Sequence, residues 1–435
     1  MTTSENRTSG PAPAERPSDG HLEELVPPEV AVQRVMALCR PLGAEVVPLS
    51  EALGRVLVAE VRSGRVLPPW DNSAMDGYAV RAAEVVPGQP LPVRGVVAAG
   101  QVAPPLPKGA TLRIMTGAPL PEGADSIIMK EEASEADGQV RFKAAPAVGQ
   151  HVRRAGEDVA LGDVVLAAGA VLGPGELGLL AALGRTLLTV HRRPQVAIVS
   201  TGDELVPADI APGPGQIANS NAHALLAQVT TAGALGRVLP IAPDDPAALR
   251  ALFAEGLTAD VLISSGGVSV GEFDFVKQVL GELGVVEHFS KVAMKPGKPL
   301  SCSTFEAPGQ AGAARRVLVM GLPGNPASSM VSFELFVRPA LLRLLGHAAE
   351  RAQRPVATVR LLTAVPRERG RLHFVRAHVR RDAEDPSRLV AQAPERQGSG
   401  MLRSMVGVNA LLHVPPGPQP LAAGETVLAT ILEAV

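Results

Sequence analysis

Residues 195–204, QVAIVSTGDE, begin with an apolar run of strand length and then turn into a glycine and two carboxylates. An apolar run without alternation is typical of a strand that is buried on both faces, as strands of parallel sheets are. The segment NAHALLAQVTTAG (221–233) follows with helical spacing and ends on a glycine, which is a common end of a helix. A buried strand followed by a helix is the repeating unit of an α/β domain.

The same alternation of strand and helix continues downstream of this stretch. Further strands are expected at GRVLPIA (236–242), DVLISSGG (260–267) and RRVLVMGLPG (315–324), and further helices at 244–257, 273–284 and 325–346. Parallel strands that alternate with helices form one sheet with helices on both faces. Residues 191–348 are therefore predicted to be an α/β domain with a central parallel sheet.

The other segments predict a multidomain chain in which β structure accompanies this α/β domain. Residues 60–147 contain strand-length apolar runs with many prolines and glycines, which is typical of a small β-rich domain. Residues 25–59 and 148–190 each contain a short helical segment, and we group them as a discontinuous N-terminal, linker-type domain. Residues 355–435 have the alternation of a C-terminal β-barrel, and residues 1–24 have the composition of a disordered arm.

The composition argues against several classes of function. The formal net charge is −2 over 435 residues, which provides no overall field to attract nucleic acid or an acidic membrane. The two cysteines, Cys39 and Cys302, lie far apart in the sequence and form neither a disulfide framework nor a metal signature, which fits a reducing cytoplasm. The most apolar stretch, 164–184, is interrupted by Pro174 and Glu176 and is not a membrane span.

Three of the predicted strands end in small and polar residues. In an open parallel sheet, ligands bind beyond the carboxyl ends of the strands. The turn at 264–267, Ser-Ser-Gly-Gly, can offer backbone N–H groups and hydroxyls to an anion. Asn325 and Pro326 can begin the last helix, whose N-terminus is a second place for an anion. Each turn alone could be an ordinary connection, but three at one edge favour a binding site.

Lysine is rare in this chain and is concentrated in one loop. Only seven lysines occur, and three of them, Lys291, Lys295 and Lys298, lie in KVAMKPGKP (291–299). Elsewhere the chain uses mainly arginine, which indicates that a compact ammonium group is preferred here over a planar guanidinium. The segment is interpreted as a cationic clamp for phosphate or another oxyanion, with a solvated basic loop as the alternative.

Carboxylates that could accompany an anion site are spread along the chain. Paired carboxylates beside phosphate would suit Mg²⁺, which takes a few oxygen ligands and keeps its waters. Alternatively, each of them could be a helix cap or a surface group. The candidates are Asp76, Asp158, Asp203, Glu204, Asp244, Asp245 and Asp274. No motif for a zinc site, a serine nucleophile or a phosphate-binding lysine loop is present, which disfavours those chemistries.

The only tryptophan and the only tyrosine, Trp70 and Tyr78, lie in PPWDNSAMDGYAV (68–80). Two large amphipathic side chains can anchor a loop that holds Asp76 in place. They could equally be the core of the small β-rich domain.

Seven segments in order resemble motifs of the MoeA family, the molybdopterin molybdenumtransferases, which are related to the E domain of gephyrin. They are DNSAMDGYAV (71–80), RIMTGAPLPEGAD (113–125), RRAGEDV (153–159), STGDEL (200–205), SSGGVSVGEFD (264–274), KPGKP (295–299) and GLPGNP (321–326). The resemblance implies a homodimer of four-domain subunits with a pterin-binding α/β domain. It also implies an Mg²⁺-dependent enzyme that inserts molybdenum from molybdate into adenylylated molybdopterin. That reaction releases AMP and molybdenum cofactor, the last step of cofactor biosynthesis.

The resemblance assigns roles by motif, and the strand-end turns add further candidates. Catalytic roles are expected for Asp76, Thr116, Asp158, Glu204, Lys291, Lys295 and Lys298. Substrate binding is expected for Ser264, Ser265, Gly266, Gly267, Pro323, Gly324, Asn325, Pro326, Arg376 and Ser399. The metal ligands are expected to be Asp76, Asp244 and Asp274. The family also implies that the loop bearing Asp76 reaches the α/β domain of the other subunit.

Three rival functions remain open from the sequence. The first is the adenylyltransferase of the same pathway, which would need ATP and is usually a single α/β domain. The second is a scaffold, as gephyrin is, which would call for an additional N-terminal domain and a long linker. The third is another nucleotide-cleaving enzyme on the same α/β fold. Partners are expected to be small molecules and a second copy of the chain, with other proteins of cofactor biosynthesis as an option.

Overall fold

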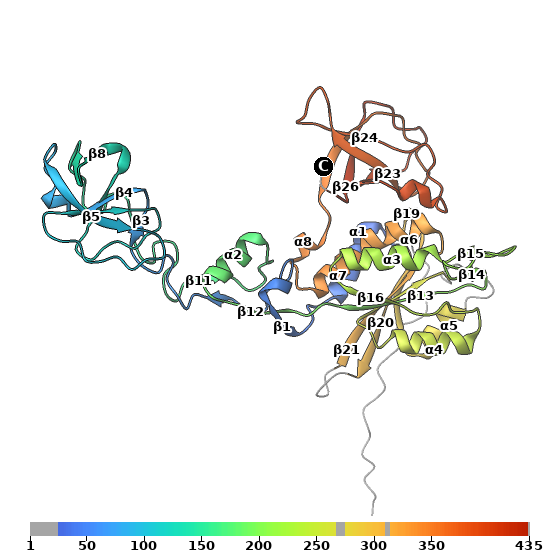
Figure 1. Ribbon diagram of the computed structural model, residues 1–435. Helices are drawn as coiled ribbons and strands as arrows, with labels where there is room; N and C mark the ends of the chain where they lie inside the picture. Colours follow the sequence, from blue (N-terminus) through green and yellow to red (C-terminus); the bar gives the residue numbers. More distant parts are fainter. Residues whose placement is uncertain (1–24, 267–274, 309–313, 434–435) are drawn as a thin grey trace, which may run out of the picture. The chain divides into compact units, whose positions relative to one another are not determined.

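The computed structural model describes residues 25–266, 275–308 and 314–433. The chain forms two compact units (Figure 1). One unit contains the residues up to Gly43 and those from Arg192 onward, and the other contains Ala44–His191. The expected disordered arm, residues 1–24, lies outside the described residues.

A six-stranded sheet is the centre of the first unit. Its spatial order is β16 (Leu235–Val238), β13 (Gln195–Ser200), β17 (Val261–Ser265), β21 (Ala314–Leu322), β20 (Pro299–Pro308) and β18 (Val286–Lys291). The first four strands run parallel to one another, whereas β20 runs antiparallel to both of its neighbours, β21 and β18. The sheet is therefore mixed rather than wholly parallel. Residues 309–313, which join β20 to β21, are too few for the crossover that parallel neighbours need.

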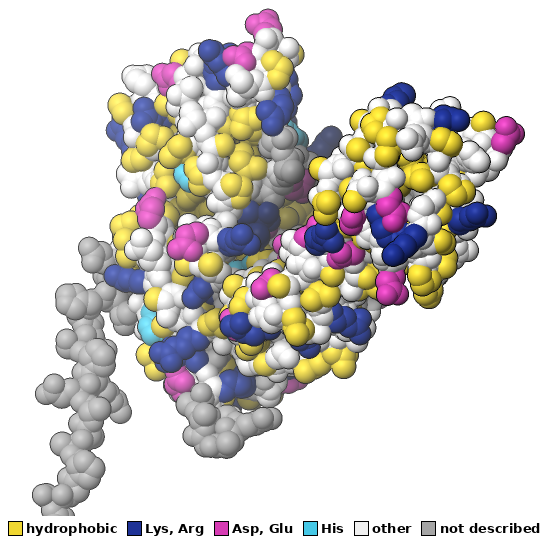
Figure 2. All heavy atoms as spheres, turned by 90° about the vertical axis from the view of Figure 1, so that its left-hand side faces the viewer, with side chains coloured by type: hydrophobic (Ala, Val, Ile, Leu, Met, Phe, Trp, Pro, Cys, Tyr) yellow, Lys and Arg dark blue, Asp and Glu magenta, His cyan; other side chains and the backbone are white. Residues whose placement is uncertain are grey.

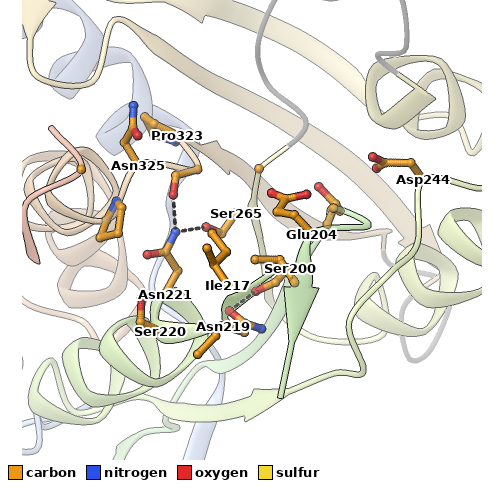
Figure 3. Close-up of a pocket in the computed structure, with 18 of the residues that line it drawn as sticks. Ser200, Glu204, Ile217, Asn219, Ser220, Asn221, Asp244, Ser265, Pro323 and Asn325 are labelled. Atoms are coloured by element: carbon orange, nitrogen blue, oxygen red, sulfur yellow. Dashed lines mark hydrogen bonds between the residues drawn. The ribbon is translucent and has the colours of Figure 1, made fainter. Parts of the chain in front are cut away.

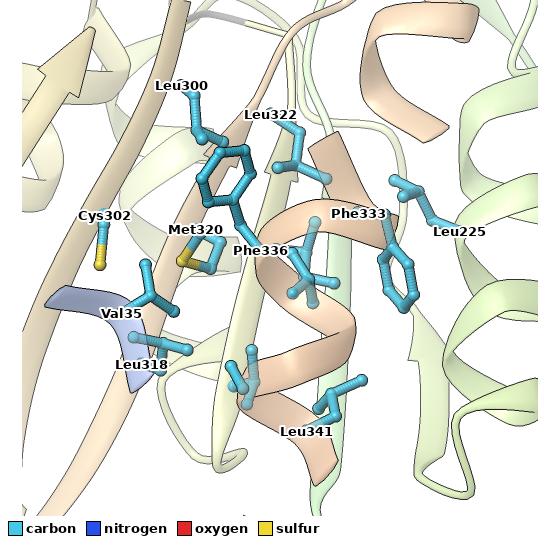
Figure 4. Packing of buried hydrophobic residues seen from close by; sticks show 14 of the residues in the cluster. Val35, Leu225, Leu300, Cys302, Leu318, Met320, Leu322, Phe333, Phe336 and Leu341 are labelled. Carbon is cyan, nitrogen blue, oxygen red and sulfur yellow. The ribbon is translucent and has the colours of Figure 1, made fainter. Parts of the chain in front are cut away.

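Helices cover both faces of this sheet (Figure 1). One face carries α1 (Pro28–Leu38), α3 (Ser220–Thr231), α6 (Pro326–Ser332), the π-helical turn η5 (Phe333–Val337) and α7 (Arg338–Leu344); the other carries α4 (Pro246–Gly256) and α5 (Phe275–Glu282). Ile198, Ile263 and Met320 point to the first face, and their strand neighbours point to the second. Figure 4 shows Phe333 and Phe336 packed in this first core. Burial on both faces explains why the strands read as continuous apolar runs.

The first helix belongs to the α/β sheet. The sequence pattern predicts that residues 25–43 belong to the N-terminal, linker-type domain. In the structure, however, Ala31 and Val35 of α1 are fully buried in the core that the sheet shares with α3 and α7. The backbone N–H of Val26 donates to the carbonyl of Lys291 at 3.1 Å. The apolar stripe of α1 therefore completes the α/β domain.

The last segment of the chain closes into a five-stranded barrel, as predicted. Its strands are β22 (Val356–Leu361), β23 (Leu372–Arg381), β24 (Leu389–Gln392), β25 (Ala410–Val414) and β26 (Thr426–Ile431), and β23 pairs with both β24 and β25. The short helix α8 (Ala349–Ala352) precedes the barrel. The two-residue strand β19 (Met294–Lys295) pairs in parallel with β23 at Leu372 and His373. The lysine-rich loop is thus fixed against the barrel.

The second unit is built from short β ladders and one small sheet. The ladders pair β1 (Ala44–Pro48) with β12 (Leu187–His191), β2 (Val61–Arg62) with β11 (Val164–Leu166), and β3 (Asn72–Ser73) with β10 (Val152–Arg153); α2 (Pro174–Ala182) lies in the same unit. The sheet has the order β7 (Ser126–Met129), β4 (Gly77–Val80), β6 (Thr111–Ile114), β5 (Pro90–Val97), β9 (Gln139–Phe142) and β8 (Ala133–Ala136).

The two unique aromatic residues of this unit have different environments. Tyr78 is buried, stacks edge-on against Phe142 with ring centroids 5.6 Å apart, and donates its hydroxyl to Glu135 at 2.5 Å. Trp70 is 53% exposed. Tyr78 therefore belongs to the core of the small sheet, and Trp70 does not.

The surface carries mixed charge. On the face drawn in Figure 2, lysine and arginine side chains are interspersed with aspartate and glutamate, as the near-balanced composition predicts. Among the described residues, no helix combines the length and apolarity that a membrane span requires.

Candidate active site

A cavity of about 700 Å³ lies at the carboxyl ends of three parallel strands, β13, β17 and β21 (Figure 3). The strand-end turns supply most of its wall. The lining residues include Ser200, Thr201, Gly202, Glu204, Asn219, Ser220, Asn221, Asp244, Ser265, Gly266, Pro299, Pro323, Gly324, Asn325, Pro326 and Gly400. The edge that the sequence predicts for ligand binding is therefore hollow. It is lined by hydroxyl, amide and carboxylate groups together with apolar side chains such as Leu205 and Ile217.

Asn221, at the start of α3, connects two of these strand ends. Its side-chain nitrogen donates to the hydroxyl of Ser265 at 2.9 Å and to the carbonyl of Gly324 at 2.7 Å (Figure 3). Asn219 caps the same helix by accepting from the N–H of Ala222 at 3.2 Å. Neither asparagine was among the sequence candidates, although Asn-Ser-Asn before a helical segment is a capping signal.

The turn after β17 differs in detail from its predicted role. Gly266 has φ +100°, and a Cβ there would lie 2.7 Å from the carbonyl oxygen of Thr201, so only glycine fits. Its N–H donates to the carbonyl of Leu322 at 3.2 Å and does not face a ligand. Ser264 lies buried in the strand, so Ser265 is the serine of this turn that lines the cavity. Gly267 lies outside the described residues.

Carboxylates gather at one end of the cavity. Glu204 and Asp244 line it, and the backbone N–H of Asp244 donates to the Asp203 carboxylate at 3.0 Å. Burial, together with the negative charges of Asp203 and Glu204, raises the pKa of Asp244 above its ordinary value. Asp245 is instead a helix cap, since it accepts from the N–H of Ala248 at 2.8 Å.

This acidic end can accommodate a divalent cation. Within the described ranges, no group of three or more His, Cys, Asp or Glu side chains is placed to hold a metal ion. However, Mg²⁺ uses one or two carboxylates and keeps several waters. A cation would also offset the mutual repulsion that raises the pKa of Asp244. Glu204 and Asp244 therefore fit Mg²⁺, whereas Asp274 lies outside the described residues.

The turn after β21 directs Asn325 toward the cavity. Asn325 occupies the N-cap position of α6, but its side chain makes no capping hydrogen bond, contrary to the sequence prediction. It lines the cavity together with Pro323, Gly324 and Pro326 (Figure 3). An amide at this position can contact a ligand because capping does not occupy it.

The lysine-rich loop borders the cavity through Pro299, which follows Lys298. Lys291 lies at the end of β18, Lys298 is exposed, and Lys295 forms an ion pair with Glu368. Gly297 has φ +98°, and a Cβ there would lie 2.7 Å from the Ser332 hydroxyl oxygen. The loop is thus packed directly on α6.

A buried group of polar side chains accompanies this loop. Arg376 is wholly buried and donates from Nη2 to the carbonyl of Gly398 at 3.3 Å, while its Nε and Nη1 find no partner in the described part of the chain. The hydroxyls of Ser329 and Ser332 on α6 are also buried and have no hydrogen-bond partner in the described part of the chain. Burial lowers the pKa of Arg376. A buried guanidinium without an anionic partner is costly, and a bound anion would offset that cost.

Ser399 connects this group to the cavity wall. Its carbonyl accepts from the N–H of Ala327 in α6 at 3.0 Å. The preceding residue, Gly398, receives the Arg376 bond, and the following residue, Gly400, lines the cavity. The segment from 398 to 400 therefore runs from the buried arginine to the cavity.

Three predicted residues belong to the second unit. The Asp76 carboxylate accepts from the backbone N–H and the hydroxyl of Thr116, both at 2.8 Å. These two hydrogen bonds lower the pKa of Asp76. Asp158 is exposed in the turn after β10. Thr116 thus holds the Asp76 side chain as an ionised carboxylate at the surface of its unit.

The fold and the site define a multidomain α/β protein with a ligand-sized cavity at the carboxyl ends of its parallel strands. Three family models match consecutive parts of the chain: the MoeA N-terminal region (domain I and II) at 26–184, the probable molybdopterin binding domain at 197–343 and the MoeA C-terminal region (domain IV) at 358–432. The chain belongs to the MoeA family.

Curated relatives and a solved structure agree. Proteins named molybdopterin molybdenumtransferase are 38% identical over 398 residues in a Nostoc species, covering 88% of each chain, and 37% identical over 395 residues in Haemophilus influenzae, covering 89% of this chain and 93% of that one. The crystal structure of the molybdopterin biosynthesis MoeA protein from Pyrococcus horikoshii matches with a TM-score of 0.76 at 27% identity. It covers 94% of this chain and 100% of that one.

Proposed function

We propose that this enzyme transfers molybdenum from molybdate to adenylylated molybdopterin, with release of AMP and molybdenum cofactor, the last step of that cofactor's biosynthesis. The observation that carries the proposal is the cavity of about 700 Å³ at the strand ends. Its volume suits one small organic ligand. The names of the curated relatives support the same chemistry.

The cavity residues would bind and orient the pterin nucleotide. Ser265 and Gly324 are held in register by Asn221, so the two strand ends present a fixed wall. Asn325 offers an uncapped amide for a hydrogen bond. A wall that is fixed before binding reduces the entropy that the reacting groups lose.

The buried group beside α6 would hold the molybdate. Among the described residues, two donor nitrogens of Arg376 and the hydroxyls of Ser329 and Ser332 have no hydrogen-bond partner. Such donors match the oxygens of a tetrahedral dianion. The exposed Lys298 would add attraction from the loop, and Lys291 would contribute charge from the end of β18.

Glu204 and Asp244 would hold a magnesium ion at the acidic end of the cavity. When bound, the ion would polarise the phosphoanhydride and neutralise charge on the leaving adenylate. Asp76, fixed by Thr116, and Asp158 would act from the second unit. We further propose that the enzyme is a cytoplasmic homodimer in which the Asp76 turn completes the site of the partner subunit.

The test is AMP release from adenylylated molybdopterin by the purified protein with Mg²⁺, with and without molybdate. We expect release that depends on both. Release that needs neither would favour another nucleotide-cleaving enzyme. No release, together with adenylylation of molybdopterin from ATP, would favour the adenylyltransferase instead.

A further inference from the structure

An ion pair occupies Lys295, one of the three lysines in the segment 291–299 that the sequence pattern predicts to be an oxyanion clamp. The ammonium of Lys295 is paired with the carboxylate of Glu368, and both side chains are 37% exposed. Glu368 precedes β23, and Lys295 lies in β19, which pairs with the start of β23. The Lys295 ammonium is therefore already paired with an anionic group of its own chain.

A histidine without hydrogen-bond partners lies beside this pair. His373 is 5% exposed and is the register partner of Lys295. Neither ring nitrogen has a hydrogen-bond partner among the residues that the structure describes. Buried polar groups are rarely left in this state, so His373 is expected to gain a partner in another state of the site.

The charges that face His373 decide what that partner can be. They are Lys295 from β19, Glu368 and Arg371 from the residues just before β23, and the buried Arg376 from β23 itself. Burial and the three cations lower the pKa of His373 to about 4, against the opposing effect of Glu368. The ring is therefore neutral at pH 7, and Glu368 is the acceptor available to it once protonated.

We propose that Glu368 is a displaceable counter-ion that pairs with Lys295 in the empty site and passes to a protonated His373 when an oxyanion binds Lys295. The proposal rests on the function proposed above and adds how the site exchanges charge. The proton comes from solvent, and no covalent bond changes. An added dianion offsets the surrounding cations, and the released carboxylate stabilises the imidazolium.

The direction of the pH dependence follows from linkage. Binding raises the pKa of His373, so oxyanion binding takes up a proton. Affinity therefore rises as pH falls, by up to tenfold per pH unit, between the bound and the free pKa of the ring. An ion pair that only positions Lys295 would not couple binding to a proton.

The experiment is isothermal titration calorimetry of the full chain with sodium molybdate and, separately, with inorganic phosphate. Each titration is run at pH 7 in buffers of different ionisation enthalpy, which gives the number of protons taken up. We expect net proton uptake by the wild type with molybdate, with phosphate or with both, and the anion that shows it identifies the ligand of Lys295. Glu368→Gln should bind about two- to fivefold more tightly, as loss of a competing exposed ion pair predicts, and take up less proton.

A second variant and a matched control separate this role from a structural one. His373→Asn should bind without proton uptake. Glu306→Gln removes another carboxylate of a surface ion pair, 50% exposed and paired with Arg316 at 2.6 Å, and should leave affinity and proton count unchanged. Binding without proton uptake by the wild type, or uptake that persists in His373→Asn, overturns the proposal while the proposed function stands. Absence of anion binding overturns both.

Discussion

The side-chain nitrogen of Asn221 lies 2.9 Å from the hydroxyl oxygen of Ser265 and 2.7 Å from the carbonyl oxygen of Gly324. One amide on a helix thus fixes the ends of two parallel strands. Asn221→Ala would remove both bonds, each worth about 1 kcal/mol net. We expect the KM for adenylylated molybdopterin to rise roughly tenfold, with a circular dichroism spectrum like that of the wild type.

A control for this variant lies on the same helix. Thr231→Ala removes an exposed hydroxyl that donates only to the carbonyl of Ala227 at 2.9 Å, and its KM should not change. An unaltered KM in Asn221→Ala would show that the strand ends hold their register without the amide.

Gly266 tests whether the strand-end turn tolerates a side chain. In Gly266→Ala the new Cβ would meet the Thr201 carbonyl oxygen at 2.7 Å at a φ of +100°. Strain of this kind costs on the order of 1–3 kcal/mol, so thermal unfolding should occur several degrees lower. Gly281→Ala, in α5 with no atom within 4 Å of the new Cβ, should instead raise stability by about 0.5–1 kcal/mol. Equal shifts in the two variants would contradict the steric argument.

The sequence predicts the α/β architecture because burial on both faces leaves a long, unambiguous signal. Residues 196–199 and 261–263 are apolar on both faces since helices cover both. The antiparallel pairing of β20 is harder to foresee, because strand direction depends on the length of the connection and not on the apolar pattern. The position of α1 is likewise set by which apolar surface it meets, and its spacing does not specify that.

The candidate site was predictable where a motif combines strand ends with glycine. Ser265 ends β17, Gly324 and Glu204 lie a few residues beyond β21 and β13, and all three line the same cavity. Asn221 and His373 have no such signal. Their roles depend on contacts across more than 40 residues, or on the absence of contacts within a buried site. A sequence pattern does not show which polar groups will have hydrogen-bond partners in the folded protein.

Arg376 offers a variant in which stability and activity should change in opposite directions. Replacing an unpaired buried charge by an apolar side chain of similar length is often neutral or stabilising. Arg376→Met should therefore unfold at an equal or higher denaturant concentration. Without the two donor nitrogens for molybdate, molybdate-dependent AMP release should fall about 100-fold, as expected for loss of a preorganised donor. Arg380→Met, at an exposed position of the same strand, should change neither the unfolding midpoint nor AMP release. A destabilised Arg376→Met would mean that the guanidinium has hydrogen-bond partners in the native state.

Asp76 should be needed for turnover and not for folding. Among the described residues, its carboxylate accepts hydrogen bonds from Thr116 alone, in a surface turn. Asp76→Asn should therefore leave the melting temperature and the proposed dimer unchanged while slowing AMP release strongly. Thr116→Val removes one of the two bonds and should raise the pKa of Asp76 toward its ordinary value, measured by carbon NMR of the carboxyl group. Loss of the dimer in Asp76→Asn would assign the residue a structural role.

Asp260 links the start of β17 to Arg192 and should make the free energy of unfolding depend on pH. The two side chains are joined by two hydrogen bonds of 2.7 Å, and Gln195 donates its N–H to the same carboxylate at 2.9 Å. Burial opposes ionisation, but these bonds together lower the pKa of Asp260. Its folded pKa lies below the unfolded value, so the stabilisation is present above the unfolded pKa and is lost as pH falls through the folded one. Asp260→Asn should lower the free energy of unfolding by about 3 kcal/mol at pH 7, and denaturant titrations should show the difference from wild type shrinking below about pH 4. A difference that stays constant down to pH 2.5 would mean that packing, and not the ion pair, is what the substitution removes.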